Sequence, residues 1–161
     1  MRARGKRTTK KTFLLTALAT GAAALAGSLG TTPRTAWYQG LRKPSWQPPS
    51  RAFPLVWTPL YGLIAYGGAR ALDGARDAER AGLARALAAN LVLNAAWPAL
   101  FFRARSPRLA LAEITLLNAS NAALVRRAAR SDRTAGALLL PYAAWTAFAT
   151  ALNASIARRN A

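Results

Sequence analysis

Five long stretches of this chain carry almost no charge, and each is long enough to cross a lipid bilayer as a helix. A membrane-spanning helix needs about 17–25 predominantly apolar residues. Four uncharged runs meet that length, and a fifth contains one carboxylate, Glu113: 12–33, 52–69, 86–102, 134–157 and 109–125. Lipid offers the backbone no hydrogen-bond partners, so such segments fold as helices. The pattern predicts an all-α membrane protein, a bundle of five transmembrane helices.

The expected helices divide the chain into a short tail and one membrane domain. We expect them at about 12–30, 53–70, 83–102, 108–127 and 134–157. Residues 1–11 then form a basic tail, residues 12–160 form the membrane domain, and about 31–52 form its first loop. The runs are rich in alanine, so a soluble basic bundle is the alternative. A cleaved signal peptide is a second alternative, but the first run is longer than a typical signal core.

Charge distribution constrains the partners and the orientation. The chain has 23 Lys and Arg against 5 Asp and Glu, a net charge of +18. These charges bracket the apolar runs, which favours anionic lipid over nucleic acid as the partner. Lys and Arg number 14 on the side of the N-terminal tail and 9 on the other side. The positive-inside rule therefore predicts an integral protein, in a bacterial cytoplasmic membrane, with its N-terminus in the cytoplasm and its first loop outside.

Several chemistries lack the residues they need. The chain has no His and no Cys, and its one Met is Met1. Disulfides and thiolate metal sites are excluded, and so are the usual general base and the common haem ligands. We find no catalytic triad, phosphate loop or carboxylate pair, so no metal site and no required cofactor are expected. A tetrapyrrole would have to be held by shape and stacking.

Trp and Pro are concentrated in the first loop and the helix that follows it. Three of five Trp and six of nine Pro lie between residues 33 and 59. Trp and Tyr favour the membrane–water boundary, and Pro stiffens a loop. The segment can therefore be an aromatic belt, which the residues alone favour, or a stiff lid over a pocket.

Polar and aromatic residues form stripes on the expected helices. One stripe has the spacing i, i+4, i+7, i+11, and a second follows the last helix: Asn90, Asn94, Trp97, Phe101; and Tyr142, Trp145, Ala149, Asn153. Pro98 leaves the Asn94 carbonyl without a helical donor. These residues can line a cavity or join helices by hydrogen bonds. For Glu113, near a helix start, snorkelling to the interface is favoured over a binding role.

Four segments together resemble the TspO/MBR family, the tryptophan-rich sensory proteins that include the peripheral benzodiazepine receptor. The resemblance covers about residues 36–160. It rests on Trp37-Tyr38 with Lys43-Pro-Ser-Trp-Gln-Pro-Pro49, on Val56-Trp-Thr-Pro-Leu-Tyr61, on Leu93-Asn-Ala-Ala-Trp-Pro98 with Phe101-Phe102, and on Pro141-Tyr-Ala-Ala-Trp145 with Phe148-Ala149 and Leu152-Asn153.

This resemblance implies a five-helix bundle, often a homodimer, whose pocket is capped by the first loop and binds porphyrins. Carried over by motif, Trp57 and Trp145 are the candidate catalytic residues of light-driven porphyrin breakdown. The ligand-binding residues are Trp46, Pro48 and Pro49 in the lid, with Trp57, Tyr61, Asn94, Trp97, Trp145, Phe148 and Ala149 in the pocket. A small-residue pair, Ala84 and Ala88, would permit close helix contact in a dimer.

We therefore expect a membrane protein that binds a porphyrin-like tetrapyrrole and serves in its transport, stress-linked regulation or light-dependent clearance. Arg42, Lys43 or Arg51 could pair with the acidic side chains of that ligand. The alternatives are a non-catalytic regulator that acts through a partner protein, and a transporter of a sterol- or lipid-like ligand. The vertebrate sterol motif needs a Tyr that Leu152-Asn-Ala-Ser155 lacks. Two further departures are Leu109, where animal members often have Trp, and Pro59, where a β-branched residue is usual.

Overall fold

The computed structural model describes residues 8–161, and all regular secondary structure in that part of the chain is helical, as predicted. Residues 1–7, most of the expected basic tail, lie outside it. The helices are α1 (Lys10–Gly30), α2 (Ala36–Gly40), α3 (Ala52–Gly74), α4 (Asp77–Pro98), the π-helix η1 (Ala99–Arg103), α5 (Pro107–Ser131) and α6 (Arg133–Arg159). Five long helices match the five apolar runs. Several extend beyond the expected spans by a turn, and α2 is an addition.

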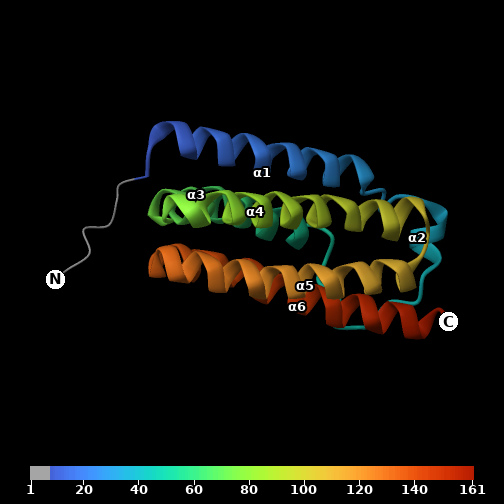
Figure 1. Cartoon of the computed structure of the whole chain (residues 1–161). Helices are drawn as coiled ribbons and strands as arrows, with labels where there is room; N and C mark the ends of the chain where they lie inside the picture. Colours follow the sequence, from blue (N-terminus) through green and yellow to red (C-terminus); the bar gives the residue numbers. More distant parts are fainter. Residues whose placement is uncertain (1–7) are drawn as a thin grey trace.

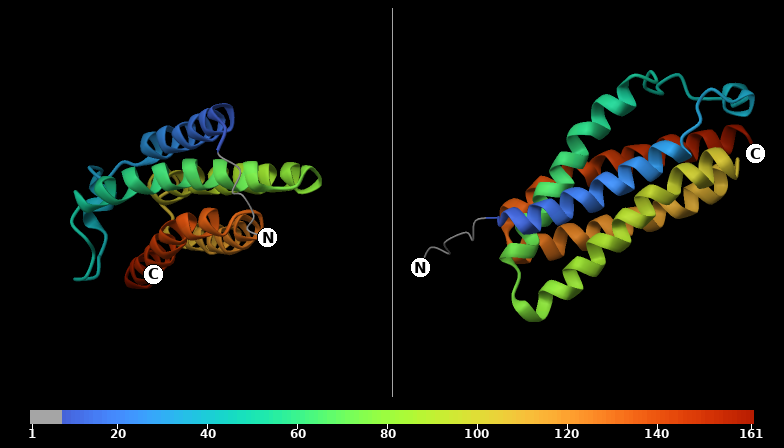
Figure 2. Two further views of the ribbon diagram at one scale, coloured as in Figure 1. Left: turned by 90° about the vertical axis from the view of Figure 1, so that its left-hand side faces the viewer. Right: turned by 90° about the horizontal axis from the view of Figure 1, so that it is seen from above.

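The five long helices lie side by side in one bundle (Figures 1 and 2). Helix α1 packs against α3 and α4, α5 packs against α4 and α6, and α3 closes the ring against α6. We call the end that carries the α3–α4 and α5–α6 turns the hairpin end (residues 9–12, 70–80 and 127–136). The opposite end, with α2 and the first loop, is the loop end (residues 31–51, 99–110 and 152–160).

Helix α1 buries its small and polar residues and turns its large apolar ones outward. Its buried stripe is Thr12, Thr16, Thr20, Ala23, Gly27 and Gly30. Leu14, Leu18 and Leu29 are 59–70% exposed on the opposite face. In water this arrangement would be unfavourable, whereas helices in lipid bury small residues at their contacts and expose apolar ones. The packing of α1 is therefore typical of a helix that faces lipid.

Three helices are long and apolar enough to cross a membrane by length and composition: α1, α4 continued through η1 (Asp77–Arg103), and α6. Helices α3 and α5 are as long but less apolar. Helix α3 carries Trp57, Pro59 and Tyr61, and α5 carries Glu113 among several polar residues. The structure thus supports five long helices, of which three have the composition of membrane spans.

A network of neutral polar side chains joins four helices in the middle of the bundle. Asn90 donates to Asn121 (2.7 Å) and Ser120 (3.0 Å), and Asn121 donates to Thr146 (2.8 Å). The network continues through Tyr142, Asn94 and Tyr61 on one side, and through Asn118 and Thr150 on the other. Buried polar groups that all find partners stabilise a bundle and fix its register.

The end of α4 changes its helical geometry at Pro98. The α-helix gives way there to η1, whose wider π turn accommodates the missing backbone donor of the proline. The kink expected at this position is therefore a change of helix type at the loop end. Arg105 follows with φ of 51° in the tight turn before α5.

Candidate ligand site at the loop end

The first loop is attached to the bundle by aromatic contacts of α2. Trp37 meets Phe101 at 5.8 Å between ring centroids, and Tyr38 meets Phe102 at 5.2 Å. Trp97 stacks on Phe101 at 4.9 Å. We call these five residues the anchor cluster. Burial raises the pKa of the Tyr38 phenol above its usual value, so this ring stays neutral at physiological pH and acts as a packing residue.

Two polar contacts fix the course of the loop after α2. The Lys43 ammonium donates to the Tyr38 carbonyl at 2.6 Å and lies 4.4 Å from the centre of the Tyr38 ring. The Asn160 side chain, beyond α6, accepts from the Arg42 backbone N–H (2.9 Å) and donates to the Arg42 carbonyl (3.0 Å). Lys43 therefore closes the end of α2, and Asn160 joins the loop to α6.

Beyond that point the loop places a second group of aromatic rings over α6. Trp46 contacts Phe148 at 5.9 Å, Phe148 contacts Trp145 at 5.2 Å, and Trp145 contacts Phe53 at 6.0 Å. We call these four residues the lid cluster. Trp46 is 48% exposed, and the other three rings are partly buried. The lid cluster is thus an incompletely covered aromatic surface formed by the loop, α3 and α6.

A third group lies deeper, where the aromatic residues meet the polar network. Trp57 stacks on Tyr61 at 5.2 Å and meets the edge of Tyr142 at 6.1 Å. The Tyr61 hydroxyl donates to Asn94 (3.3 Å), and the Asn94 amide donates to the Tyr142 hydroxyl (3.2 Å). The acceptor oxygen and the donor nitrogen of the Asn94 side chain therefore both have partners inside the protein. This favours the interpretation that Asn94 joins helices rather than binds a ligand.

The predicted ligand residues are distributed among these three groups. Trp46, Trp145 and Phe148 lie in the lid cluster, whereas Trp57, Tyr61 and Asn94 lie around the inner stack. Trp97 belongs to the anchor cluster, where its indole N–H donates to Asn153 at 3.1 Å. Pro48 and Ala149 are half-buried, and Pro49 is exposed. Trp57 and Trp145 pack against the same apolar core, so the two candidate photochemical residues share one region.

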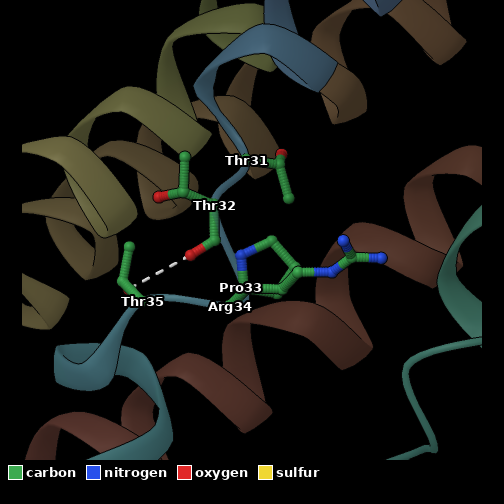
Figure 3. A pocket seen from close by; sticks show the side chains of 5 residues that line it. All are labelled: Thr31, Thr32, Pro33, Arg34 and Thr35. Carbon is green, nitrogen blue, oxygen red and sulfur yellow. Dashed lines mark hydrogen bonds between the residues drawn. The ribbon is translucent and has the colours of Figure 1, made fainter.

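Two hollows among the described residues lie away from the lid cluster. One, with a volume of about 450 Å³, opens beside the link from α1 to α2 and is lined by Thr31, Thr32, Pro33, Arg34 and Thr35 (Figure 3). Another lies at the hairpin end and is lined by Thr8, Thr9, Lys10, Phe13 and Tyr66. None of these is a predicted ligand residue. The aromatic side chains of the lid cluster pack on one another, so a guest would have to displace Trp46.

Although the sequence led us to expect that the Glu113 carboxylate reaches the membrane surface, it is covered by neighbouring residues. Both of its carboxylate oxygens are buried and take no hydrogen bond from the residues that the structure describes. Snorkelling to the membrane surface, the favoured interpretation, is therefore wrong for this conformation, because the side chain of a residue two turns into α5 is covered by its neighbours. Within residues 8–161 no group of three His, Cys, Asp or Glu side chains could hold a metal ion.

Sequence reasoning missed two residues of the loop end. Phe53 lies one helical turn before Trp57, so the i, i+4 spacing could have placed it on the same face. Asn160 carried no such signal, because its partner Arg42 is 118 residues away in the sequence. Tyr142 was placed on a stripe and proves to be fully buried at the centre of the polar network.

Comparison with known proteins gives a consistent result. Residues 13–159 match the sequence profile of the TspO/MBR family. The chain is 39% identical to a human protein named translocator protein, over 77% of this chain and 75% of that protein. It is 36% identical to the tryptophan-rich sensory protein of Cereibacter sphaeroides (92% and 90%) and 35% identical to the tryptophan-rich protein TspO of Chlorobaculum tepidum (93% and 98%).

Proposed function

The chain belongs to the TspO/MBR family, and from that premise we propose that it is a five-span membrane protein that binds a porphyrin-like tetrapyrrole beneath its first loop. The observation that carries the proposal is the lid cluster. Trp46, Phe53, Trp145 and Phe148 come from three separate segments and meet at one incompletely covered surface. Well-placed aromatic pairs contribute about 0.5–1.5 kcal/mol each. A flat aromatic guest that displaces Trp46 from Phe148 and is then covered by it would gain several such contacts.

The surroundings of the lid cluster favour a ligand held by stacking. The chain has no His or Cys to ligate iron, and the polar side chains beneath the cluster are neutral amides and hydroxyls that already have partners. We therefore expect the metal-free ring and its iron form to bind within about tenfold of each other. A Soret band characteristic of nitrogen or thiolate ligation by the protein would contradict this expectation.

In the proposed topology α3 and α5 also span the membrane. Their polar residues Asn118, Asn121 and Tyr61 face other helices in hydrogen bonds, so the outer surfaces can face lipid. The proposed orientation has the hairpin end in the cytoplasm and the loop end outside. A reporter inserted near Ser50 should be accessible from outside the cell, and one at the N-terminus should not.

For a homodimer, Ala84 and Ala88 lie exposed on α4, where a second copy could approach.

Light-dependent clearance of the ligand is a second candidate function. Indole is the most readily oxidised side chain in this chain, and Trp57 stacks on Tyr61 while it contacts Tyr142. An excited porphyrin that accepts one electron from such an indole would start its own breakdown. A regulator that acts through a partner protein, or a carrier of sterol- or lipid-like molecules, would bind its ligand without consuming it.

The test is a binding titration followed by illumination. Protoporphyrin IX should quench tryptophan emission saturably in detergent, and Trp145→Phe should weaken binding by no more than about 1–1.5 kcal/mol because an aromatic ring remains. Trp37→Phe in the anchor cluster is the matched control and should bind as the wild type does. Linear, unsaturated quenching would reject the binding proposal. If the wild type bleaches its porphyrin no faster than free porphyrin bleaches, the clearance candidate fails and the binding proposal stands.

A further inference from the structure

Acidic residues are absent from one end of this protein. Four of the five Asp and Glu lie at the hairpin end, namely Asp73, Asp77, Glu79 and Asp132, and the fifth is Glu113 within α5. The loop end carries nine Lys and Arg and no acidic residue: Arg34, Arg42, Lys43, Arg51, Arg103, Arg105, Arg108, Arg158 and Arg159. The ion pairs of the described chain, Arg70–Asp132 and Arg80–Asp73, both lie at the hairpin end. The cations of the loop end therefore have no internal counter-charge.

Some of these cations are engaged in other contacts. Lys43 donates to three backbone carbonyls around the end of α2, and Arg103 donates to the Leu29 carbonyl at the end of α1 (3.0 Å). Lys43 was one of three residues expected to meet an acidic ligand. Its donors are committed to the loop, so the ligand contact has to come from other residues.

The Asn160 clamp brings together cations that are distant in the sequence. Asn160 binds the backbone of Arg42 from both sides, at 2.9 and 3.0 Å, and Arg158 and Arg159 immediately precede Asn160 in α6. The loop and the red end of α6 meet at this point in Figure 1. The clamp uses only the Arg42 backbone, and the side chains of Arg42 and Arg158 are both exposed. The Arg159 Nε donates to the Ser155 hydroxyl (3.3 Å), which leaves the other guanidinium nitrogens of Arg159 available. Three arginines thus lie at the Asn160 contact or within two residues of it, at the junction of the first loop and α6.

This arginine group lies in line with the lid cluster. From Asn160 the loop runs back along α6 until Trp46 meets Phe148. Twelve residues of helix separate Phe148 from Asn160, which corresponds to roughly 18 Å. The last part of α6 and the first loop beside it therefore carry the lid cluster near Phe148 and the arginine group near Asn160. A ligand with a flat apolar body and acidic groups on one edge matches that arrangement, because guanidinium groups bind oxyanions in charge-assisted hydrogen bonds.

We propose that Arg42, Arg158 and Arg159, gathered by Asn160, form an anion subsite that binds the carboxylates of the ligand held by the lid cluster. This inference rests on the proposed function, since it supplies the polar half of the same site. The chemistry recognised is an oxyanion at the end of an apolar body. An anionic lipid headgroup would offer the same chemistry through its phosphate, so the test has to separate the two sources.

The experiment compares protoporphyrin IX with its dimethyl ester, which has the same ring and no carboxylates. Binding is measured by tryptophan quenching in uncharged detergent, where no lipid phosphate competes. Arg42→Gln combined with Arg158→Gln should weaken the free acid by roughly three- to tenfold, and this loss should shrink in high salt because the groups are exposed. The same double variant should bind the ester as the wild type does. Arg126→Gln with Arg133→Gln, two exposed arginines at the hairpin end, is the control for net charge and should change neither ligand.

Asn160→Ala tests whether the clamp matters. It removes no charge, but it releases Arg42 from α6, so the free acid should again lose affinity and the ester should not. If the arginine pair affects acid and ester equally, or if the hairpin-end control weakens the acid as much, the subsite is wrong. Saturable binding of the ester would still uphold the proposed function in that case. If the wild type binds acid and ester alike in uncharged detergent, and the arginine pair changes only the binding of anionic lipid, the arginines serve lipid phosphate and the proposal is overturned.

Discussion

At the hairpin end, buried carboxylates tie the helices to one another, whereas at the loop end the contacts are aromatic edges and single hydrogen bonds. Asp73 accepts from the Thr9 N–H and the Thr12 hydroxyl, both at 2.7 Å, and thereby holds the start of α1 against α3. Asp132 caps α6 and pairs with Arg70 of α3 at 2.6 Å. The loop end has no Asp or Glu side chain. One end is therefore built to stay closed, and the other can release its loop without breaking an ion pair.

Glycine packing shows the same contrast. A Cβ added to Gly136 at the hairpin end would lie 2.6 Å from the Cβ of Ala129, so α5 and α6 touch there almost backbone to backbone. A Cβ added to Gly40, the last residue of α2, would meet nothing within 4 Å. The end of α2 therefore has free space around its backbone, which a moving lid requires.

The largest expected effect is the loss of the Asp73 carboxylate. Asp73→Ala leaves the Thr9 N–H, the Thr12 hydroxyl and the Arg80 guanidinium without their acceptor, so we expect the free energy of unfolding to fall by about 2–3 kcal/mol. Asn160→Ala, which removes the clamp of the loop end, should cost less than about 1 kcal/mol, because its hydrogen bonds are exposed to water. Thermal unfolding of both variants in one detergent measures the difference. Equal losses would remove the distinction between the ends.

The second largest expected effect is the loss of stability when a methyl group is added where α5 and α6 pack closely. Gly136→Ala should destabilise the protein by about 1–3 kcal/mol, because α5 and α6 would have to separate, even though Ala is the better helix former. Gly40→Ala should be neutral or stabilise by up to about 1 kcal/mol, since its φ is not positive and its surroundings are open. The same unfolding measurement applies. A neutral Gly136→Ala would mean that the two helices pack less closely than described.

Low pH should reduce the contribution of the hairpin end to the free energy of unfolding and leave that of the loop end unchanged. Burial acts to raise the pKa of Asp73, which lies beyond the expected membrane span, but the hydrogen bonds from Thr9 and Thr12 and the charge of Arg80 outweigh it and lower the pKa. Because the folded pKa is the lower one, ionised Asp73 contributes its full stability above the unfolded pKa of about 4. The contribution is lost as pH falls from there through the folded pKa, by at most about 1.4 kcal/mol per pH unit.

The measurement is the difference in stability between the wild type and Asp73→Asn across pH. It should be constant above pH of about 5 and shrink below pH of about 4. The corresponding difference for Asn160→Ala should not change over this range, since no Asp or Glu side chain lies at the loop end. A wild-type advantage over Asp73→Asn that grows on acidification would contradict the lowered pKa.

The sequence predicted most of the fold because length and charge decide where helices can lie in a membrane. Four uncharged runs and a fifth that contains only Glu113 located the five long helices, and the Asn and Trp stripes face inward. Helix ends were less predictable, because Asp73 and Asp132 lie just beyond the expected spans. Asp73 accepts from Thr9 and Thr12 at the start of α1, and Asp132, which caps its own helix α6, also pairs with Arg70 of α3. Composition alone also left α3 and α5 weaker as spans, since Trp57, Tyr61 and Asn121 lower their hydropathy although all three contact other helices.

For the site, the motifs identified the residues but not their grouping. Spacing along one helix could relate Trp57 to Tyr61, and their stacking at 5.2 Å agrees with it. It could not reveal that Trp97 packs with the anchor cluster while Trp145 packs under the lid, because that division depends on contacts between segments. Nor could it show that the donors of Lys43 are engaged by backbone carbonyls, or that Asn160 holds Arg42. Long-range contacts of single polar residues leave no periodic trace in a sequence.

Only a small change in stability is expected from the loss of Trp46, and it gives the sharpest test of the comparison. Trp46 is 48% exposed and its ring contact is with Phe148 at 5.9 Å, so Trp46→Ala should lower the free energy of unfolding by less than about 1 kcal/mol. Porphyrin affinity should nevertheless fall by about tenfold, because the guest loses the ring that covers it. Unfolding and quenching titrations on the same preparation measure both quantities. A residue that contributes little to the empty protein and much to the complex belongs to a ligand site. If Trp46→Ala unfolds as easily as Asp73→Ala, or binds porphyrin as the wild type does, the loop end is a structural cap and not a lid.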